Sequence, residues 1–328
     1  MRTKQKISGL NFLILFIVTG FVLAACTPTS QPTEQVTAEP FTLRLALLPI
    51  LDTLPMYVAD EEGLFEKYDL QVEFIPVASA PEREQVITAG QADGMINEAV
   101  STMFYNKDKT QVQIVRFARA ATTEQPVFRI LVAANSDIKT VDDLRGIEIG
   151  VSQGTVIEYL TDRLLQEEGF GSADIKTIAV PKIPDRMALL GAGEIQAAML
   201  PEPLSSLAEL GGAHVIIDDT RHPEYSFSTI SFRKAVIDEN PQAITGFLKA
   251  LEEAVQLINE NPEDWRTLMV SKNLVPEPLL ESYKVPEFVT AGVPSESQWL
   301  DALEWAMEKG LLEVNVSYSE SVTDKYLP

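Results

Sequence analysis

The sequence predicts an α/β fold of two lobes, each a mostly parallel sheet flanked by helices, with a ligand cleft between the lobes. Strand-like and helix-like segments alternate along the chain, and the same order of segments occurs twice. Two further strand-like segments stand where the chain would cross between the repeats. Because parallel sheets bind ligands beyond the carboxyl ends of their strands, two such sheets that face each other would enclose a cleft.

The first repeat begins with a strand over residues 41–48, where apolar side chains alternate and then run on. We expect the next helix to begin at Pro55, because the missing proline N–H costs nothing in the first turn. Residues 70–77 are the second strand, and Ser79 to Glu82 form a capping box that opens another helix. Met95 and Ile96 begin a third, buried strand.

The second repeat has the same order. It contains a strand over 147–151, a helix over 155–168, a strand over 175–180 and a helix opened by Pro184.

Matching residues support the repeat. Pro81-Glu82-Arg83 recurs as Pro184-Asp185-Arg186, and Ala89-Gly90 recurs at the same spacing as Ala192-Gly193. Glycine also follows the first helix of each repeat, where it suits a left-handed helix end.

The expected domain limits follow from this pattern. The first lobe covers 41–135, the second covers 136–222, and the chain returns to the first lobe over 223–328. The segments 128–134 and 228–232 are the expected crossings. Helices with capping residues at their starts should complete the first lobe, beginning near Asn240, Asn261 and Ser295.

The first 25 residues predict a secretory signal, with a basic start and an apolar stretch from Leu10 to Leu23. The stretch ends in Leu23-Ala24-Ala25-Cys26, which resembles the bacterial lipoprotein box and predicts a lipid on Cys26. An uncleaved transmembrane anchor is the alternative, since the apolar stretch approaches the length of a span. Residues 26–40 are rich in Thr, Pro and Gln, which predicts a flexible tether.

Composition excludes several classes of partner. The formal net charge is −22, and loss of the basic signal would make the mature chain more acidic, so nucleic acid is not expected as a partner. Two histidines, His214 and His222, cannot build a nitrogen-rich transition-metal site, so no metal is expected. Cys26 is the single cysteine, which excludes an internal disulfide.

Five motifs resemble the nitrate, sulfonate and thiamine-precursor family of periplasmic-binding-protein-like receptors, over roughly residues 41–310. They are 49–55, 57–65, 89–94, 141–146 and 199–203. The resemblance implies a lipid-anchored, extracytoplasmic substrate-binding subunit of an ABC importer. Such a protein acts as a monomer without a cofactor, captures a small solute and delivers it to permease subunits that work with a cytoplasmic ATPase. Sulfonates and aminopyrimidines are among the solutes that the family binds.

The resemblance also places a ligand site, at the ends of strands in both lobes. The residues carried over are Leu51, Asp52, Thr53, Asn97, Glu98, Ser152, Gly154, Thr155, Pro201, Glu202 and Pro203. The segment from Ser152 to Thr155 has independent support, because it joins a strand to a helix and so offers N–H groups and the positive end of the helix dipole. The alternative is that Thr155 only caps its helix, with Glu158 completing the box.

Acidic residues in this set bear on the charge of the ligand. Glu98 and Glu202 end equivalent strands, and Asp52 follows the first strand. Since buried carboxylates need donors, they favour a ligand rich in N–H or O–H groups and weigh against nitrate. Alternatively, Asp52 is a turn residue, and Glu202 lies at the cleft rim in a salt bridge or at the permease contact.

Two other functional classes are compatible with this fold. The pyrimidine-precursor synthases of yeast resemble this fold, but they rely on a cysteine-rich segment and histidine, whereas the lone Cys26 is expected to carry lipid. We therefore expect no enzyme activity. A signalling receptor with the same lobes is the other alternative, and genes for a permease and an ATPase beside this one would favour transport.

Overall fold

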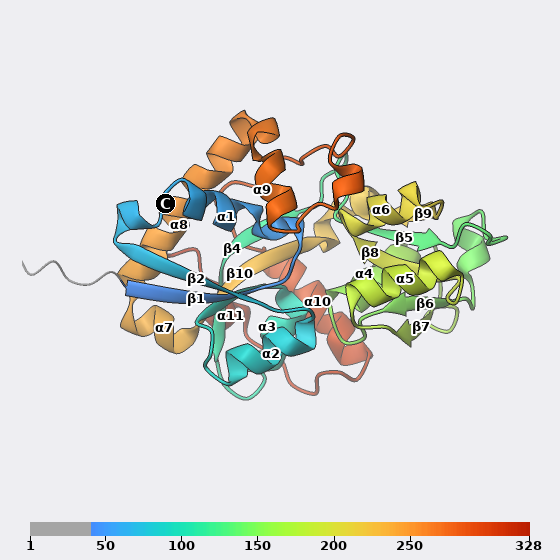
Figure 1. The fold of residues 1–328 in the computed structure, drawn as a ribbon. Coiled ribbons are helices and arrows are strands. Elements are labelled where there is room, and N and C mark those ends of the chain that lie inside the picture. Colours follow the sequence, from blue (N-terminus) through green and yellow to red (C-terminus); the bar gives the residue numbers. More distant parts are fainter. Residues whose placement is uncertain (1–40) are drawn as a thin grey trace, which may run out of the picture. The chain divides into compact units, whose positions relative to one another are not determined.

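The computed structural model describes residues 41–328, so the predicted signal, Cys26 and the tether lie outside the described residues. The described chain contains a first sheet with the strand order β2-β1-β3-β10-β4 (Figure 1). Its strands are β1 (Phe41–Leu47), β2 (Leu70–Pro76), β3 (Gly94–Asn97), β4 (Val112–Ala120) and β10 (Phe227–Arg233).

A second sheet repeats this arrangement with the order β7-β6-β8-β5-β9. Its strands are β5 (Phe128–Val132), β6 (Glu148–Val151), β7 (Lys176–Ala179), β8 (Ala197–Pro201) and β9 (His214–Asp218). In both sheets the first three strands are parallel, and one antiparallel strand follows them, β10 in the first sheet and β5 in the second. The predicted α/β architecture of two mostly parallel sheets is confirmed. We call the two sheets with their helices the first and second lobes.

The crossings between the lobes differ from expectation. The segments 128–134 and 228–232 were predicted as crossings, but β5 pairs with β8 and β9, and β10 pairs with β3 and β4. The second sheet therefore begins at Phe128, before the limit expected at 136. The chain crosses at 121–127 and 219–226, and the Ala121 N–H donates to the carbonyl oxygen of Ser226 at 2.9 Å, so the crossings run side by side.

Helices cover both faces of the first sheet (Figure 1). Leu43, Leu45 and Leu47 of β1 share a core with α1 and α8, whereas Ala46, which faces the other way, packs with Ile87 of α2. The helices are α1 (Leu54–Glu61), α2 (Ala80–Thr88), α3 (Ala99–Asn106), α4 (Val156–Glu167), α5 (Ile183–Ala192), α6 (Leu204–Leu210), α7 (Lys234–Glu239), α8 (Pro241–Glu260), α9 (Arg266–Ser271), α10 (Glu296–Glu308) and α11 (Tyr318–Ser321). Across residues 41–328, none of them is long and apolar enough to span a bilayer.

Most of the predicted helix ends are confirmed. The Ser79 hydroxyl caps α2, and Ser295 and Gln298 form a capping box at the start of α10. Gly169 has φ 83°, the left-handed conformation expected past the end of α4. Asn240 and Asn261 were predicted as caps, but their side chains make no capping hydrogen bond. Each asparagine precedes a proline, which restricts its backbone conformation.

The helix α10 belongs to neither lobe alone. It was expected to complete the first lobe, yet Trp299 and Trp305 of α10 are buried in one core with Met103 of α3 and Leu160 of α4. Helix α10 therefore packs against both lobes.

Candidate functional site

A cavity of about 80 Å³ lies between the two sheets. The first lobe supplies one part of its wall and the second lobe the other. Of the predicted residues, six line it: Asp52, Asn97, Glu98, Ser152, Thr155 and Pro201. The other lining residues were not predicted: Leu48, Ile50, Ser79, Ala80, Arg83, Ile96, Phe128, Val156, Ile157, Pro181, Ile183 and Ser228.

The amino ends of four helices reach this cavity. Residues at or just before the starts of α2, α3, α4 and α5 are in its wall: Ala80, Glu98, Val156 and Ile183. The first turn of a helix carries N–H groups without intrahelical partners and the positive end of the dipole. The remaining wall is largely apolar, so the cavity suits a small molecule that has both an apolar part and a polar group.

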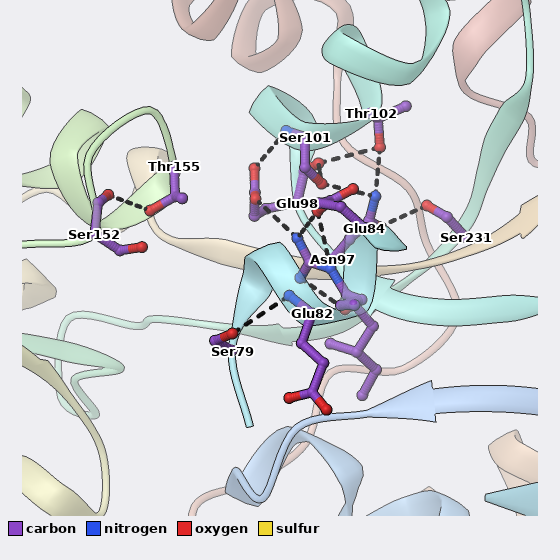
Figure 2. A network of polar contacts seen from close by, with 12 residues as sticks. Ser79, Glu82, Glu84, Asn97, Glu98, Ser101, Thr102, Ser152, Thr155 and Ser231 are labelled. Atoms are coloured by element: carbon purple, nitrogen blue, oxygen red, sulfur yellow. Dashed lines mark hydrogen bonds and ion pairs between the residues drawn. The ribbon is translucent and has the colours of Figure 1, made fainter. Parts of the chain in front are cut away.

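Asn97 is fully occupied by bonds within the protein. Its amide nitrogen donates to the hydroxyls of Ser101 at 3.1 Å and Thr102 at 2.8 Å. Its amide oxygen accepts from Thr229 at 3.1 Å and Ser231 at 2.7 Å. Figure 2 shows this network around the start of α3, with Ser152 and Thr155 on a separate turn. The side chain therefore fixes β3 against β10 and α3.

Glu98 caps α3 from inside the cavity wall. Its carboxylate accepts from the Ser101 N–H at 2.9 Å and lies 3.6 Å from the guanidinium of Arg83. Burial raises the pKa of Glu98, and the charge of Arg83 opposes that rise. Arg83 was not predicted as a site residue, although its place in the repeated Pro81-Glu82-Arg83 motif was the available signal.

Asp52 lies deep in the wall and has two partners. It accepts from the Ser228 hydroxyl at 2.6 Å, and its other oxygen is 3.6 Å from a guanidinium nitrogen of Arg119. Its neighbours Leu51 and Thr53 were predicted as ligand contacts but are fully buried and do not line the cavity. Both belong to the 3₁₀ turn 51–53, which packs inward, and the Thr53 hydroxyl donates to the Ile50 carbonyl at 2.8 Å.

The turn from Ser152 to Thr155 is closed mainly by its own bonds. The Thr155 hydroxyl donates to the Ser152 carbonyl at 2.7 Å and accepts from the Ile157 N–H at 3.2 Å, so Thr155 does cap α4. The Gly154 N–H, predicted to be free for a ligand, donates to the Glu158 carboxylate at 2.7 Å. Gly154 has φ +70°, a backbone conformation that residues with a side chain rarely adopt, and no protein atom lies near its absent Cβ.

Glu202 and Pro203 lie away from the cavity. Glu202 borders a second recess of about 600 Å³, together with Arg119 and Arg129, and Pro203 borders a third recess. The Glu202 carboxylate lies 3.1 Å from Arg129 and accepts from the Ser206 hydroxyl at 2.7 Å and from Ser205. The rim salt bridge that was the alternative for Glu202 is therefore present.

Each predicted acid thus faces an arginine. The pairs are Asp52 with Arg119, Glu98 with Arg83, and Glu202 with Arg129. Each of these acids therefore has an arginine beside it, although Arg83 also pairs with Glu84 and Arg129 also pairs with Glu209. Among residues 41–328 no cluster of three or more His, Cys, Asp or Glu side chains could hold a metal ion.

Comparison with known proteins finds relatives that are named as binding proteins. Residues 51–265 match the model of the family described as NMT1/THI5 like. A protein of Escherichia coli named for binding aliphatic sulfonates is 30% identical over 155 residues, which is 47% of this chain and 48% of that protein. The nitrate/nitrite binding protein NrtA of a Nostoc species is 26% identical over 270 residues, or 72% of this chain and 60% of NrtA. The chain thus spans less than two thirds of either relative.

Solved structures share the fold. The periplasmic aliphatic sulphonate binding protein SsuA of Escherichia coli superposes with a TM-score of 0.71 at 24% identity, covering 84% of this chain and 95% of SsuA. The desulfurization enzyme DSZB has a TM-score of 0.67 at 12% identity, covering 87% of this chain and 97% of DSZB, so the fold alone does not separate binding proteins from enzymes. Because the family model matches well over half of the sequence, the chain belongs to the NMT1/THI5-like family.

Proposed function

We propose that the chain is the solute-binding subunit of an ABC importer, held outside the plasma membrane by a lipid on Cys26. In this role it captures a small organic solute by closure of its lobes and presents it to a permease. The observation that carries the proposal is the cavity whose wall is divided between the lobes. A solute bound there contacts both lobes, so it should bind the closed arrangement more tightly than the open one. Binding would then shift the lobes toward the closed arrangement.

The size of the cavity supports closure as the mode of capture. Its 80 Å³ is well below the ~300 to 1,000 Å³ of ordinary ligand pockets. Separation of the lobes would enlarge the cavity for a solute, and the two side-by-side crossings are the segments about which they would turn. The relatives named above are binding proteins, which favours capture over catalysis.

The identity of the solute is tested by measuring the thermal shift that sulfonates, nitrate, aminopyrimidines and amino acids each cause. A ligand at a hundred times its dissociation constant adds about 2.7 kcal/mol of stability, which is easily detected. Val156→Trp should abolish the shift, because Val156 lines the cavity and a larger ring would fill it. The matched control is Ile178→Trp, which introduces the same ring at an exposed site on β7. A shift that survives Val156→Trp would place binding elsewhere.

The lipid anchor is a separate part of the proposal. Cys26→Ala should block both lipidation and cleavage of the signal, so the protein would keep its leader. Mass spectrometry of the wild-type amino terminus, together with membrane fractionation, checks this. An unmodified terminus at another position would contradict it.

A further inference from the structure

A cavity of about 180 Å³ lies between α4 and the end of α10, and we call it the α4–α10 cavity. It shares no lining residue with the cavity between the two sheets. Its wall includes Asp162 of α4, Trp305 and Glu308 of α10, Lys309 just after α10, and Ser172 and Ile175 before β7. A cavity of this size has room for several water molecules or for a small organic molecule.

Asp162 brings a buried carboxylate to this wall. Its side chain is only 4% exposed. One oxygen, Oδ2, accepts from the Trp305 indole N–H at 2.7 Å and lies 2.8 Å from the Lys309 ammonium. The other oxygen, Oδ1, has no hydrogen-bond partner among residues 41–328. Because a buried carboxylate oxygen without a donor is costly, Oδ1 calls for a donor from a molecule in the cavity.

The charges around the cavity favour a positively charged donor. Lys309 lies beside two carboxylates, those of Asp162 and Glu158, and Arg163 pairs with Asp301. Glu308 adds a further carboxylate from an exposed position on α10. Two cations therefore stand against four carboxylates, so the surroundings of the cavity keep a net negative charge that attracts a cation.

The rest of the wall indicates which kind of cation fits. Among residues 41–328 no cluster of three or more His, Cys, Asp or Glu side chains could hold a metal ion, which disfavours a divalent metal. Ile175 and the indole of Trp305 offer apolar surface to a short alkyl chain. A primary ammonium has three N–H donors, and Asp162, Glu308 and the hydroxyl of Ser172 offer oxygen acceptors in the same wall.

We propose that the α4–α10 cavity is a binding site for a small primary amine, whose ammonium group donates to Oδ1 of Asp162 and is balanced by the carboxylate of Glu308. This site is separate from the cavity assigned to the solute, so the inference does not depend on the proposed function. A bound amine would join α4 of the second lobe more firmly to α10, which also packs against α3 of the first lobe.

Ethylammonium is the probe, and ethanol, which has the same size and no charge, is the comparison. The readout is the indole N–H resonance of Trp305 in a nitrogen–proton correlation NMR spectrum, assigned by its loss in Trp305→Phe. Because this N–H donates to Asp162, its resonance should shift with ethylammonium until the site is saturated. Ethanol should cause no such shift.

Two variants test the residues of the site. Asp162→Asn should weaken ethylammonium binding at least about tenfold, because the hydrogen bond lost joins two charged groups. Glu308→Lys places a second ammonium group in the wall and should abolish binding, and its fold should be retained because position 308 is exposed. The matched control is Glu304→Lys, the same charge reversal at an exposed position one turn earlier on α10 and outside the cavity wall. It should change the affinity much less.

The outcomes decide between a ligand site and a hydrated cavity. Absence of a saturable shift with ethylammonium would overturn the proposal, and the cavity would then hold water only. An affinity unchanged in either Asp162→Asn or Glu308→Lys would also overturn it, and Glu308→Lys decides alone if Asp162→Asn does not fold. Binding lost in Val156→Trp would place the amine in the cavity between the sheets. None of these results bears on solute capture, which the thermal-shift panel tests separately.

Discussion

One buried carboxylate joins the two crossings between the lobes. Asp219, in the second crossing, accepts from the Val127 N–H of the first crossing at 3.0 Å and from the Phe128 N–H at the start of β5 at 2.9 Å. It also accepts from the hydroxyl of Ser226 in its own crossing. Burial raises the pKa of Asp219 to about 6, and these three hydrogen bonds and the charge of Arg119 oppose the rise. The segments about which the lobes would turn are therefore tied at a titratable group.

The raised pKa predicts how stability depends on pH. Between about pH 4 and pH 6 the folded protein binds a proton at Asp219 that the unfolded chain releases, so this group's contribution is fully present below pH 4 and is lost as the pH rises through 6. A shift of this size corresponds to about 3 kcal/mol. Asp219→Asn lacks this dependence, so its melting temperature relative to wild type should rise from pH 4 to pH 7. A difference that is constant across this range would contradict the assignment.

Single residues were predicted well where the signal is local. Ser79 and Thr155 cap their helices as expected, because a cap and the N–H that it serves are only a few residues apart. The charge of the site was predicted poorly. Asp52 meets Arg119, which comes from a distant strand, and no local pattern shows such a pairing.

At the scale of elements, α10 holds α4 through one ammonium group. Lys309, just after α10, lies 2.8 Å from the carboxylate of Asp162 and 3.2 Å from that of Glu158. Trp305 donates to the same Asp162 carboxylate at 2.7 Å. Burial raises the pKa of Asp162, and the bonds from Lys309 and Trp305 oppose that rise. Because Glu158 also accepts from Gly154, this contact supports the turn at the cavity.

Removal of the ammonium group should therefore destabilise the fold. Lys309→Met leaves two buried carboxylates without their cation and should lower the free energy of unfolding by about 1 to 3 kcal/mol, less than for a fully buried pair because the Lys309 side chain is 35% exposed. The loss should be smaller at pH 5 than at pH 8, since Asp162 is then more often protonated. Urea unfolding measures both effects. Lys249→Met, at an exposed position on α8, is the control. An equal loss of stability in that variant would contradict the role assigned to the Lys309 ammonium group.

Elements were predictable to the extent that their own sequence defines them. The strands and helices of both repeats were found within a few residues, because alternation, glycine and proline mark them locally. The strands β5 and β10 were also predicted as strands, but their pairing within the two sheets was not predicted. Pairing of β5 with β8 joins segments about seventy residues apart, and only the tertiary structure sets that partner. The same limit explains why α10 was assigned to the first lobe alone.

At the scale of the whole described chain, the two lobes share the walls of a narrow cavity of about 80 Å³ and of a wider recess of about 600 Å³. Capture in the narrow cavity would require a wider arrangement of the lobes and closure when the solute binds. The polar contacts of Asp301 with Tyr159 and Arg163 add to those of Lys309, so α10 should move with α4. The motion would then occur between α10 and α3, and at the two crossings.

The most direct test of solute capture is a distance measured across the cavity. Spin labels at Thr88→Cys on α2 and Ala188→Cys on α5 report on opposite lobes, both positions are exposed, and Cys26→Ala removes the only other thiol. Double electron–electron resonance should give a longer and broader distance distribution without ligand than with the compound found by screening. A bound ligand, established by calorimetry, that leaves the distribution unchanged would contradict capture by closure.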